Sequence, residues 1–521
     1  MREIIYIQAG SFANYTGTHF WNTQESYFTY DGEDEPIVNH DLSFEEGRSP
    51  QNQPTLCPRL LAFDHKSHFG TLAKTNEADL ATNASLDTTW RGAVSRETQD
   101  PIPQSEYHAR LESNMEEGDD LEHQDPKIRY WSDYSRVYLD QKSIQAIPDA
   151  LESTEAEWSI GQGLFRRYDE VLLLFLRLIA SEMIMQETEL MDGAFRLLVE
   201  NCDNFQGLQM MHDTSTFGGF SHAFMTSFRD EFLKASVLNF SFLSGADPNH
   251  AGIDNSFDTK RLVNDALCLQ SLHQLSDIAF PILHPSRWST LESTLSQGLA
   301  YDRNNLYHTS AVVSSLMETA TLPLRLKDSQ DDIATIADHL NWRKSSRFGQ
   351  LGGIVSLPVP ATTSMFTNLH CNLSTGVPNT DDLAVFARQN VTRGLLHQDL
   401  TAFNAWCDMS SLREPLVSSI YAPAYPVPTS FPSIFRHTRP RSLRMTSSLL
   451  TAPSTSIQLT GYAKFVEQTA RTRRSDGALM SMGLESDDVK ELVTALWEIV
   501  DGYGHEGEDL VSSDKIDEGD D

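Results

Sequence analysis

The sequence predicts an α/β fold around a doubly wound, mostly parallel sheet. Short apolar runs with strand character, at 2–8, 205–210 and 236–243, alternate with longer segments whose apolar residues recur at helical spacing, at 164–182 and 259–279. Strands that alternate with helices form a parallel sheet, because each helix carries the chain back to the start of the next strand.

Length and composition limit the classes of protein. A chain of 521 residues allows two or three domains, and an apolar content of 40% is typical of globular proteins. The most apolar run, 171–180, is interrupted by Arg177 and is too short for a transmembrane segment. Five scattered cysteines without a CxxC pair fit a reducing compartment. The N-terminus shows neither a signal peptide nor an arginine-rich transit sequence, so any organelle is expected to be contacted from the cytosolic side.

The charge of the chain argues against nucleic acid as a direct ligand. A formal net charge of −33 opposes binding to a polyanion. Two basic clusters, 436–444 and 471–474, are interpreted as solvated loop charge, with a contact to an acidic partner or to lipid headgroups as the alternative.

A glycine pair, Gly218 and Gly219, stands between a strand-like stretch and a helix with an apolar stripe at Phe220, Phe224 and Phe228. A glycine turn that opens a helix lets backbone N–H groups approach an anion, and the helix N-terminus favours negative charge. The sequence therefore predicts a phosphate-binding turn here.

Three stretches resemble known proteins. Residues 201–212, with the letters NCD, QGLQ and a histidine, resemble the strand that leads into the signature loop of tubulin. The N-terminus MREIIYIQAG resembles that of tubulin. Residues 11–24, SFANYTGTHFWNTQ, are similar to the Misato family, whose fungal members are called Dml proteins. The resemblance implies a tubulin-like fold, with a smaller α+β intermediate domain and C-terminal helices after the sheet domain.

The resemblance also implies a nucleotide site. Residues 301–305, YDRNN, resemble the start of the central tubulin helix, where a tyrosine stacks on guanine and an asparagine binds its edge. Without the family, the same residues would be read as an ordinary helix start. The residues implied for the site are Gly10, Asn14, Gly218, Gly219, Tyr301 and Asn305.

Several of the surrounding residues depart from tubulin. Ser11 and Phe12 replace the glutamine and cysteine that tubulins place against the nucleotide, while Asp213 would repel a polyphosphate and Phe217 and Phe220 crowd the cradle. We therefore expect an eroded site and no cofactor, with GTP binding as the alternative.

The tubulin loop that presents an acid to the nucleotide of the next subunit is only partly kept. Its glycine and asparagine align with Lys327 and Gln330, and only the acid, Asp332, survives. Hydrolysis by the tubulin mechanism is therefore not expected. Neither GxxxxGK[ST], HExxH nor GxSxG occurs, and His212 and His222 are interpreted as structural rather than as metal ligands.

The expected domains follow from these motifs. Residues 1–321 form the nucleotide-binding-type domain, with an acidic insertion at 31–125 and a central linking helix at 304–321; 322–450 form the intermediate domain, and 451–521 the C-terminal helices and acidic tail. Further expected elements are strands at 143–148 and 354–359, helices at 187–199, 381–389 and 486–500, and Pro- and Ser-rich connectors at 423–432 and 440–453.

The resemblance implies a function. Misato/Dml proteins are implied to act in mitochondrial distribution and in inheritance of mitochondrial DNA, with links to chaperonin-assisted cytoskeletal assembly. We expect a non-enzymatic protein on the cytosolic face of mitochondria with a cytoplasmic pool. Its expected contacts are cytoskeletal or chaperonin proteins and, peripherally, the mitochondrial outer membrane. The alternative is a tubulin-related GTP-binding switch or GTPase.

Overall fold

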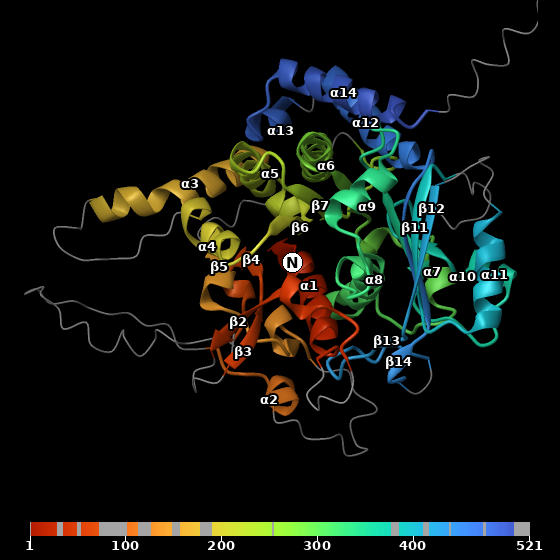
Figure 1. The fold of residues 1–521 in the computed structure, drawn as a ribbon. Coiled ribbons are helices and arrows are strands. Elements are labelled where there is room, and N and C mark those ends of the chain that lie inside the picture. The colour runs from red at the N-terminus through yellow and green to blue at the C-terminus, as the bar shows by residue number, and fades with distance from the viewer. Residues whose placement is uncertain are drawn as a thin grey trace, which may run out of the picture.

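A six-stranded sheet, a five-stranded sheet and a group of C-terminal helices make up the folded body of the protein (Figure 1). The computed structural model describes residues 2–28, 35–48, 54–71, 102–112, 127–147, 157–177, 190–252, 255–376, 385–409, 416–436, 439–472 and 476–504.

The six-stranded sheet is parallel throughout and has the order β5-β4-β1-β6-β7-β8. The chain adds β4 and β5 on one side of β1 and then returns to place β6 on the other side. Ligands of such sheets bind at the carboxyl ends of the strands, where the order reverses. That point here lies between β1 and β6. The strands are β1 (Glu3–Ala9), β4 (Leu60–His65), β5 (Ile144–Ile147), β6 (Phe205–Asp213), β7 (Ser236–Phe242) and β8 (Ile278–Ile282).

Helices cover both faces of this sheet, so the predicted doubly wound α/β architecture is confirmed. Every residue of β1 is buried, with Tyr6 in the core on one face and Ile7 in the core on the other. A strand buried on both faces reads as a continuous apolar run rather than as an alternation. The covering helices are α1 (Ser11–Glu25), α3 (Trp158–Arg177), α5 (Thr214–Glu231) and α6 (Ser256–Leu275).

The second sheet has the order β10-β9-β15-β11-β12. Its central strand β15 is antiparallel to β9 and β11, while β12 is parallel to β11 and lies at the edge. Helix α8 (Leu306–Thr321) packs between α1 and this sheet, as the predicted central linking helix should. The other elements are β9 (Gln350–Ile354), β10 (Cys371–Asn372), β11 (Ala387–Arg393), β12 (Leu416–Ala422), β15 (Met445–Thr451), α10 (Thr363–Leu369) and α11 (His397–Cys407).

A buried ionic cluster joins the two sheets through α8. The carboxylate of Glu318, which is fully buried, accepts hydrogen bonds from Gln24 at 2.9 Å, Tyr27 at 3.0 Å, Arg393 at 3.3 Å and Arg325 at 3.4 Å. Gln24 belongs to α1, and Arg393 ends β11. The cluster therefore ties the first sheet's helix layer to the second sheet.

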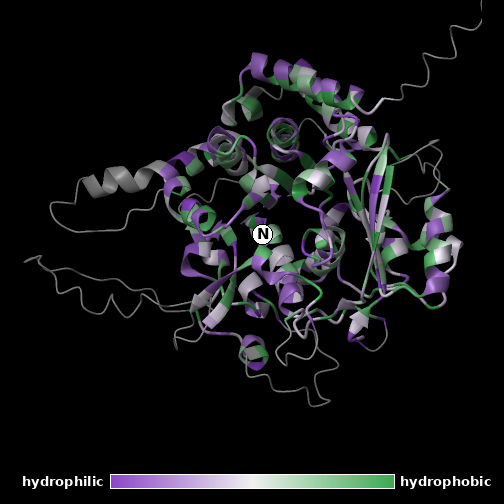
Figure 2. Cartoon of the chain, in the orientation of Figure 1, coloured by the Kyte–Doolittle hydropathy of each residue, from purple (hydrophilic) through white to green (hydrophobic). Residues whose placement is uncertain are grey.

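The C-terminal helices pack against α6, and α14 begins at the residue where the sequence predicts a helix. Hydrophilic and hydrophobic residues alternate along α14, whereas both sheets contain hydrophobic segments (Figure 2). In the part of the chain that the structure describes, no helix combines the length and apolar character needed to cross a membrane. The remaining elements are β2 (Phe44–Arg48), β3 (Pro54–Pro58), β13 (Tyr425–Pro426), β14 (Ser442–Leu443), α2 (Glu106–Glu112), α4 (Arg196–Glu200), α7 (Glu292–Leu295), α9 (Ile333–Leu340), α12 (Thr455–Arg471), α13 (Asp476–Ser481) and α14 (Ser486–Asp501).

Five sequence predictions about elements differ from the structure, either throughout or at one end. The segment 31–125 is not simply an insertion, because it supplies β4, which pairs directly with β1. The helix predicted at 259–279 is present as α6, but it ends at Leu275 and the strand β8 follows. The strand predicted at 354–359 lies earlier, at β9, and only Ile354 belongs to both. In the helix predicted at 381–389, the described residues lead into the strand β11.

The connector predicted at 440–453 contains β15, the central strand of the second sheet. Its prolines and serines favour a connector, yet seven of its residues, Met445–Thr451, form a buried strand. The hydroxyl of Ser447 donates to the carbonyl of Leu316 at 2.7 Å, and that of Thr451 donates to the carbonyl of Leu340 at 2.7 Å. Buried hydroxyls that find acceptors carry little cost, so a polar strand can occupy the core.

Two further element predictions are confirmed over their described residues. The strand at 143–148 is β5, and the helix at 187–199 is present over its described part as one π-helical turn followed by α4. The end of the helix at 164–182 lies outside the described residues, as does the acidic tail from 505 onward.

Candidate functional site

The point where the strand order reverses is filled by a side chain of the protein itself. Asp213 ends β6, and its carboxyl accepts hydrogen bonds from the backbone N–H groups of Phe12 at 2.8 Å and Ala13 at 2.9 Å. These N–H groups belong to the first turn of α1, where a helix binds anions. Gly10 makes the contact possible, because a Cβ there would lie 2.6 Å from the Asp213 side chain.

Asp213 lies next to a second buried carboxyl. Burial, and to a smaller extent the nearby Asp64, raise the pKa of Asp213 to about 7, although the two backbone hydrogen bonds act in the opposite direction. Asp64 is 1% exposed and accepts from Asn14 at 3.3 Å, while His68 lies 3.0 Å away. Asn14 also donates to the carbonyl of Phe63 at 2.9 Å. Asn14 therefore holds the end of β4 against α1.

Gly218 and Gly219 do not form the predicted turn, which is a correction to the sequence analysis. Helix α5 begins directly after β6, and both glycines lie inside its second turn. A Cβ on Gly219 would lie 2.2 Å from the carbonyl oxygen of Trp158 in α3, and one on Gly218 would lie 3.1 Å from the amide of Asn264. The glycine pair therefore permits close packing of helices.

A third buried carboxyl, that of Asp265, fixes the loop that follows β7. It accepts hydrogen bonds from the hydroxyls of Thr214, Ser244 (2.6 Å) and Tyr462 (3.2 Å), and burial raises its pKa. The sequence analysis did not single out Asp265. The available signal was a carboxylate on the apolar side of a predicted helix, three residues after Leu262.

Asn305 and Tyr301 have separate environments. Asn305 caps α8 by accepting from the backbone N–H of Tyr307 at 3.0 Å. Tyr301 precedes the helix and lines a cavity of about 450 Å³ together with Glu292, Asp302, His308 and Arg436. The Tyr301 hydroxyl is buried without a hydrogen-bond partner among the described residues, and burial raises its pKa to about 12.

A second cavity, of about 350 Å³, lies beyond the carboxyl ends of β7 and β8 and is lined by Ser215, Ser244, Arg261 and His284. Of the six residues predicted for the nucleotide site, only Tyr301 lines one of these two cavities.

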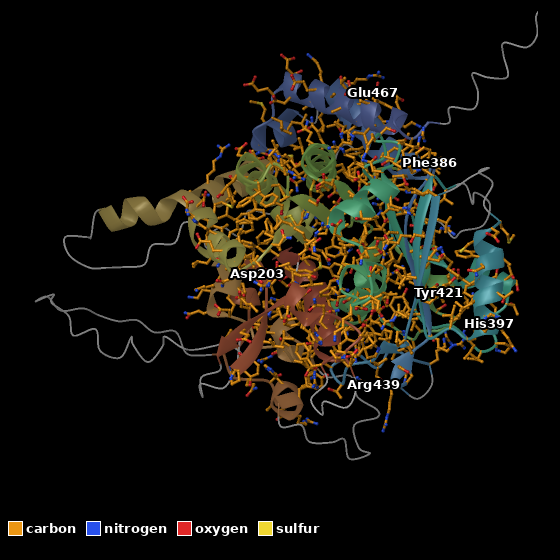
Figure 3. The ribbon with its side chains drawn as sticks, viewed as in Figure 1. Asp203, Phe386, His397, Tyr421, Arg439 and Glu467 are labelled. Atoms are coloured by element: carbon orange, nitrogen blue, oxygen red, sulfur yellow. The ribbon has the colours of Figure 1, made fainter. Side chains whose placement is uncertain are left out.

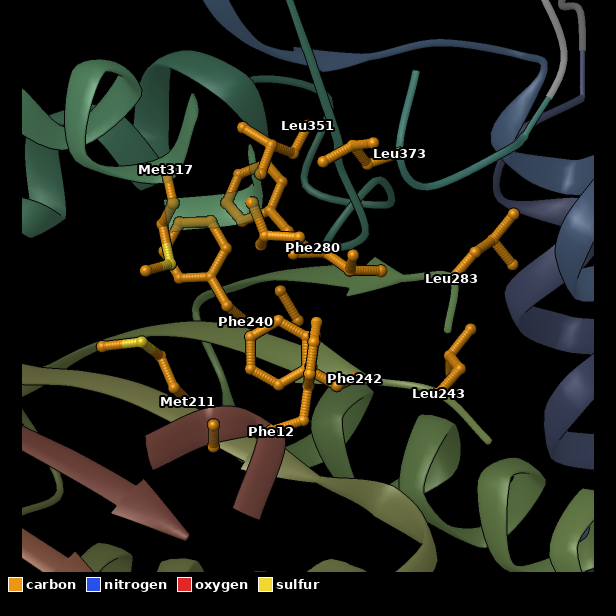
Figure 4. Close-up of a cluster of buried hydrophobic side chains, with 14 of the residues drawn as sticks. Phe12, Met211, Phe240, Phe242, Leu243, Phe280, Leu283, Met317, Leu351 and Leu373 are labelled. Atoms are coloured by element: carbon orange, nitrogen blue, oxygen red, sulfur yellow. The ribbon is translucent and has the colours of Figure 1, made fainter. Parts of the chain in front are cut away.

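The ring of Phe12 lies at the carboxyl end of β7. It packs edge-on against the ring of Phe242 at a centroid distance of 5.0 Å, and the two rings are seen together in Figure 4.

The predicted acid, Asp332, and the histidine His212 both contact other groups of the chain. Asp332 caps α9 by accepting from the backbone N–H of Thr335 at 2.8 Å, and it pairs with Arg2. Nε2 of His212 lies 3.2 Å from the sulfur of Cys268, and burial lowers the pKa of His212 to about 3. The described ranges contain no group of three or more side chains placed to hold a metal ion.

Comparison with known proteins identifies the family. Residues 2–113 match the family described as Misato Segment II tubulin-like domain, and residues 122–326 match the Tubulin domain. Protein dml1 of Aspergillus oryzae is 33% identical over 349 residues, which is 65% of this chain and 64% of that protein. Protein dml1 of Schizosaccharomyces pombe is 30% identical over 347 residues, or 63% and 67%. Protein dml1 of Aspergillus clavatus is 28% identical over 537 residues, or 96% and 97%.

The match with the Aspergillus oryzae protein and with Protein DML1 of Gibberella zeae spans 64% of the length of each. The part of the chain that matches the Tubulin domain contains β6, β7, β8 and α8, and the Misato segment contains β1, α1 and β4. The expected tubulin-like fold is confirmed, and the chain belongs to the Misato/Dml family of tubulin-like proteins.

Proposed function

We propose that this chain is a non-enzymatic tubulin-like protein that acts in the distribution of mitochondria and the inheritance of mitochondrial DNA. The mitochondrial role comes from the family resemblance. The non-enzymatic role rests on one observation, the carboxyl of Asp213 on the first N–H groups of α1.

A bound polyphosphate would have to displace this carboxyl. The N–H groups that would hold a phosphate are already paired with this carboxyl, and its ionised form, which predominates above about pH 7, would repel a phosphate. Asp64 adds a second carboxyl at the same end of the sheet. No cofactor is therefore part of the proposal, and the fold supplies a rigid body for protein contacts.

The proposed place of action is the cytosolic face of mitochondria, with a cytoplasmic pool. Cytoskeletal or chaperonin proteins are the proposed partners, and the contact with the outer membrane is peripheral. Removing the gene should scatter mitochondrial DNA unevenly between daughter cells, and the wild-type chain should restore even partition. Normal partition without the gene would refute the mitochondrial role.

Calorimetry with GTP and Mg²⁺ on the purified full chain tests the non-enzymatic role. We expect no binding at micromolar concentrations, because Asp213 blocks the anion position. Asp213→Ser removes the blocking carboxyl and should raise the affinity for GTP, whereas Asp203→Ser, at an exposed carboxyl labelled in Figure 3, should not. Micromolar binding by the wild type would overturn the proposal.

One observation favours the alternative, a GTP-binding switch or GTPase. Tyr301, the residue that the tubulin resemblance places against the base, lines the cavity of about 450 Å³.

Phosphate release over a range of protein concentrations tests the enzymatic part of this alternative. We expect no turnover that rises with concentration, because Asp332 is held by Arg2 and by its own helix. Turnover that depends on concentration and is lost in Asp332→Ala would establish the GTPase.

A further inference from the structure

Among the described residues, the edge strand β12 has a strand partner on one side only. It pairs with β11, and no other described strand pairs with it. Its sequence, LVSSIYA, contains neither a charged residue nor proline. The exposed fractions of Leu416, Val417 and Tyr421 are 45%, 42% and 52%. Tyr421 is labelled at the second sheet in Figure 3. Native proteins protect edge strands with charges, proline or bulges, because an open edge recruits another strand.

The apolar surface continues beyond the start of β12. The indole N–H of Trp342 donates to the carbonyl of Phe386 at 3.1 Å, and the same carbonyl accepts from the backbone N–H of Leu416 at 3.2 Å. The exposed fraction of Trp342 is 51%. Trp342 and Leu416 are therefore neighbours, and the open edge has an aromatic side chain at one end.

The backbone direction of β12 decides which residues can pair outward. Because the N–H of Leu416 points to β11, the even-numbered residues 416, 418, 420 and 422 pair inward. Successive residues of a strand alternate in direction. The N–H and C=O groups of Val417, Ser419 and Tyr421 therefore point away from β11 and toward the open side.

We propose that β12 pairs with β12 of a second copy of this chain, antiparallel about a two-fold axis at Ser419. In this register Ser419 opposes Ser419 of the second copy, and Val417 opposes Tyr421 of the second copy. All three outward residues then face outward residues. Three opposing pairs that each exchange two N–H···O bonds give about six backbone hydrogen bonds. The two five-stranded sheets become one continuous sheet.

The strand is self-complementary in this register, which favours a second copy over an unrelated strand. A shift of the axis by one residue would leave one of the three outward residues of each strand without a partner in β12 of the second copy, and a shift by two would leave two without one. Val417 across from Tyr421 is a pair of a β-branched and an aromatic residue, which stabilises antiparallel strands. No like charges are opposed, because β12 carries none.

Charged residues introduced at Ser419, on the two-fold axis, test both the interface and the register. Analytical ultracentrifugation of the full wild-type chain should show dimers. Ser419→Lys places two lysines opposite each other and should raise the dissociation constant about tenfold or more, as should Ser419→Glu with two carboxylates. An equimolar mixture of the two variants should restore the dimer as a Lys–Glu heterodimer.

Ser419 suits this test because its side chain is exposed and its nearest described partner, the amide of Asn390, is 3.4 Å away. Thr494→Lys is the matched control, because it adds the same charge at an exposed site on α14. Its dimer should form as in the wild type, and thermal unfolding should confirm that all variants are folded. A wild type that stays monomeric at tens of micromolar, a dimer that tolerates Ser419→Lys, or a mixture that stays monomeric would each overturn the proposal.

Discussion

Asp213 combines two roles that are usually separate in an α/β protein. It ends the strand β6, and its carboxyl caps the helix α1. The carboxyl accepts from the backbone N–H of Phe12, which lies 201 residues earlier in the chain. A helix N-terminus favours a negative charge, but burial of a carboxylate is costly. The raised pKa shows that burial outweighs the helix N-terminus at this site.

Because the pKa of Asp213 is raised in the folded protein, we predict that the free energy of unfolding depends on pH. Its pKa rises from 3.8 to about 7 on folding. Between these values the folded protein keeps a proton that the unfolded chain has released, so the free energy of unfolding falls as pH rises from about 4 to about 7. The expected slope is about 1 kcal/mol per pH unit.

Denaturant unfolding of the wild type and of Asp213→Asn across this range provides the measurement. The difference between the two cancels the contributions of all distant titrating groups. The wild type should lose stability relative to the variant as pH rises and should stop losing it above about 7. Parallel pH profiles for the two proteins would contradict the prediction.

At the scale of elements, the contact between α3 and α5 depends on missing side chains. Gly161 of α3 lies against the backbone of Phe220 in α5, and Gly219 of α5 lies against the backbone of Trp158 in α3. Each glycine leaves room for the backbone of the neighbouring helix. This explains why a glycine pair that looks like a phosphate turn belongs to a helix.

Two glycines on α3 give a matched test of this contact. A Cβ on Gly161 would lie 2.9 Å from the backbone nitrogen of Phe220, whereas one on Gly163 would meet nothing within 4 Å. Gly161→Ala should therefore cost about 1–3 kcal/mol through overpacking. Gly163→Ala should be neutral or stabilise by up to about 1 kcal/mol, because alanine favours a helix.

Thermal or denaturant unfolding of the two variants measures this difference, and Gly219→Ala should behave like Gly161→Ala. A phosphate-binding role for the glycine pair would show a different pattern. In that case Gly219→Ala would leave stability unchanged, and the prediction would fail.

At the scale of the whole molecule, Glu318 of α8 connects the helix α1 of the first sheet with the strand β11 of the second. Two guanidinium groups, from Arg325 and Arg393, meet this one carboxylate, and all three side chains are at most 1% exposed. Removing one partner of a buried ionic group leaves the others uncompensated, which is strongly destabilising. The joint between α1, α8 and β11 therefore depends on one residue.

Glu318→Gln should lower the free energy of unfolding by about 3 kcal/mol or more. The exposed pair of Lys344 and Asp338, 2.6 Å apart, provides the control, and Asp338→Asn should change stability by less than about 1 kcal/mol. Scanning calorimetry of the full chain compares the two variants. An equal, small effect of both would show that the buried cluster does not hold the two sheets together.

Local sequence patterns predict a large part of this fold. Apolar spacing predicts the strand β1 and the phenylalanine stripe of α5, because spacing over one element shows which face is buried. The resemblance of residues 301–305 to tubulin predicts the central helix α8. The family motifs lie in these elements or directly before or after them. The tubulin-like class is therefore determined by the sequence itself.

Only the tertiary structure decides what the sequence left ambiguous. The segment that became β15 carries serines and threonines and resembles a loop until neighbouring backbone accepts its hydroxyls. The glycine pair resembles a turn until α3 lies against it. In the sequence Asp213 is predicted to repel a phosphate, and the fold shows that its carboxyl binds the first N–H groups of α1. In each case the deciding partner is distant in sequence, and local spacing carries no information about contacts that form only when the chain is folded.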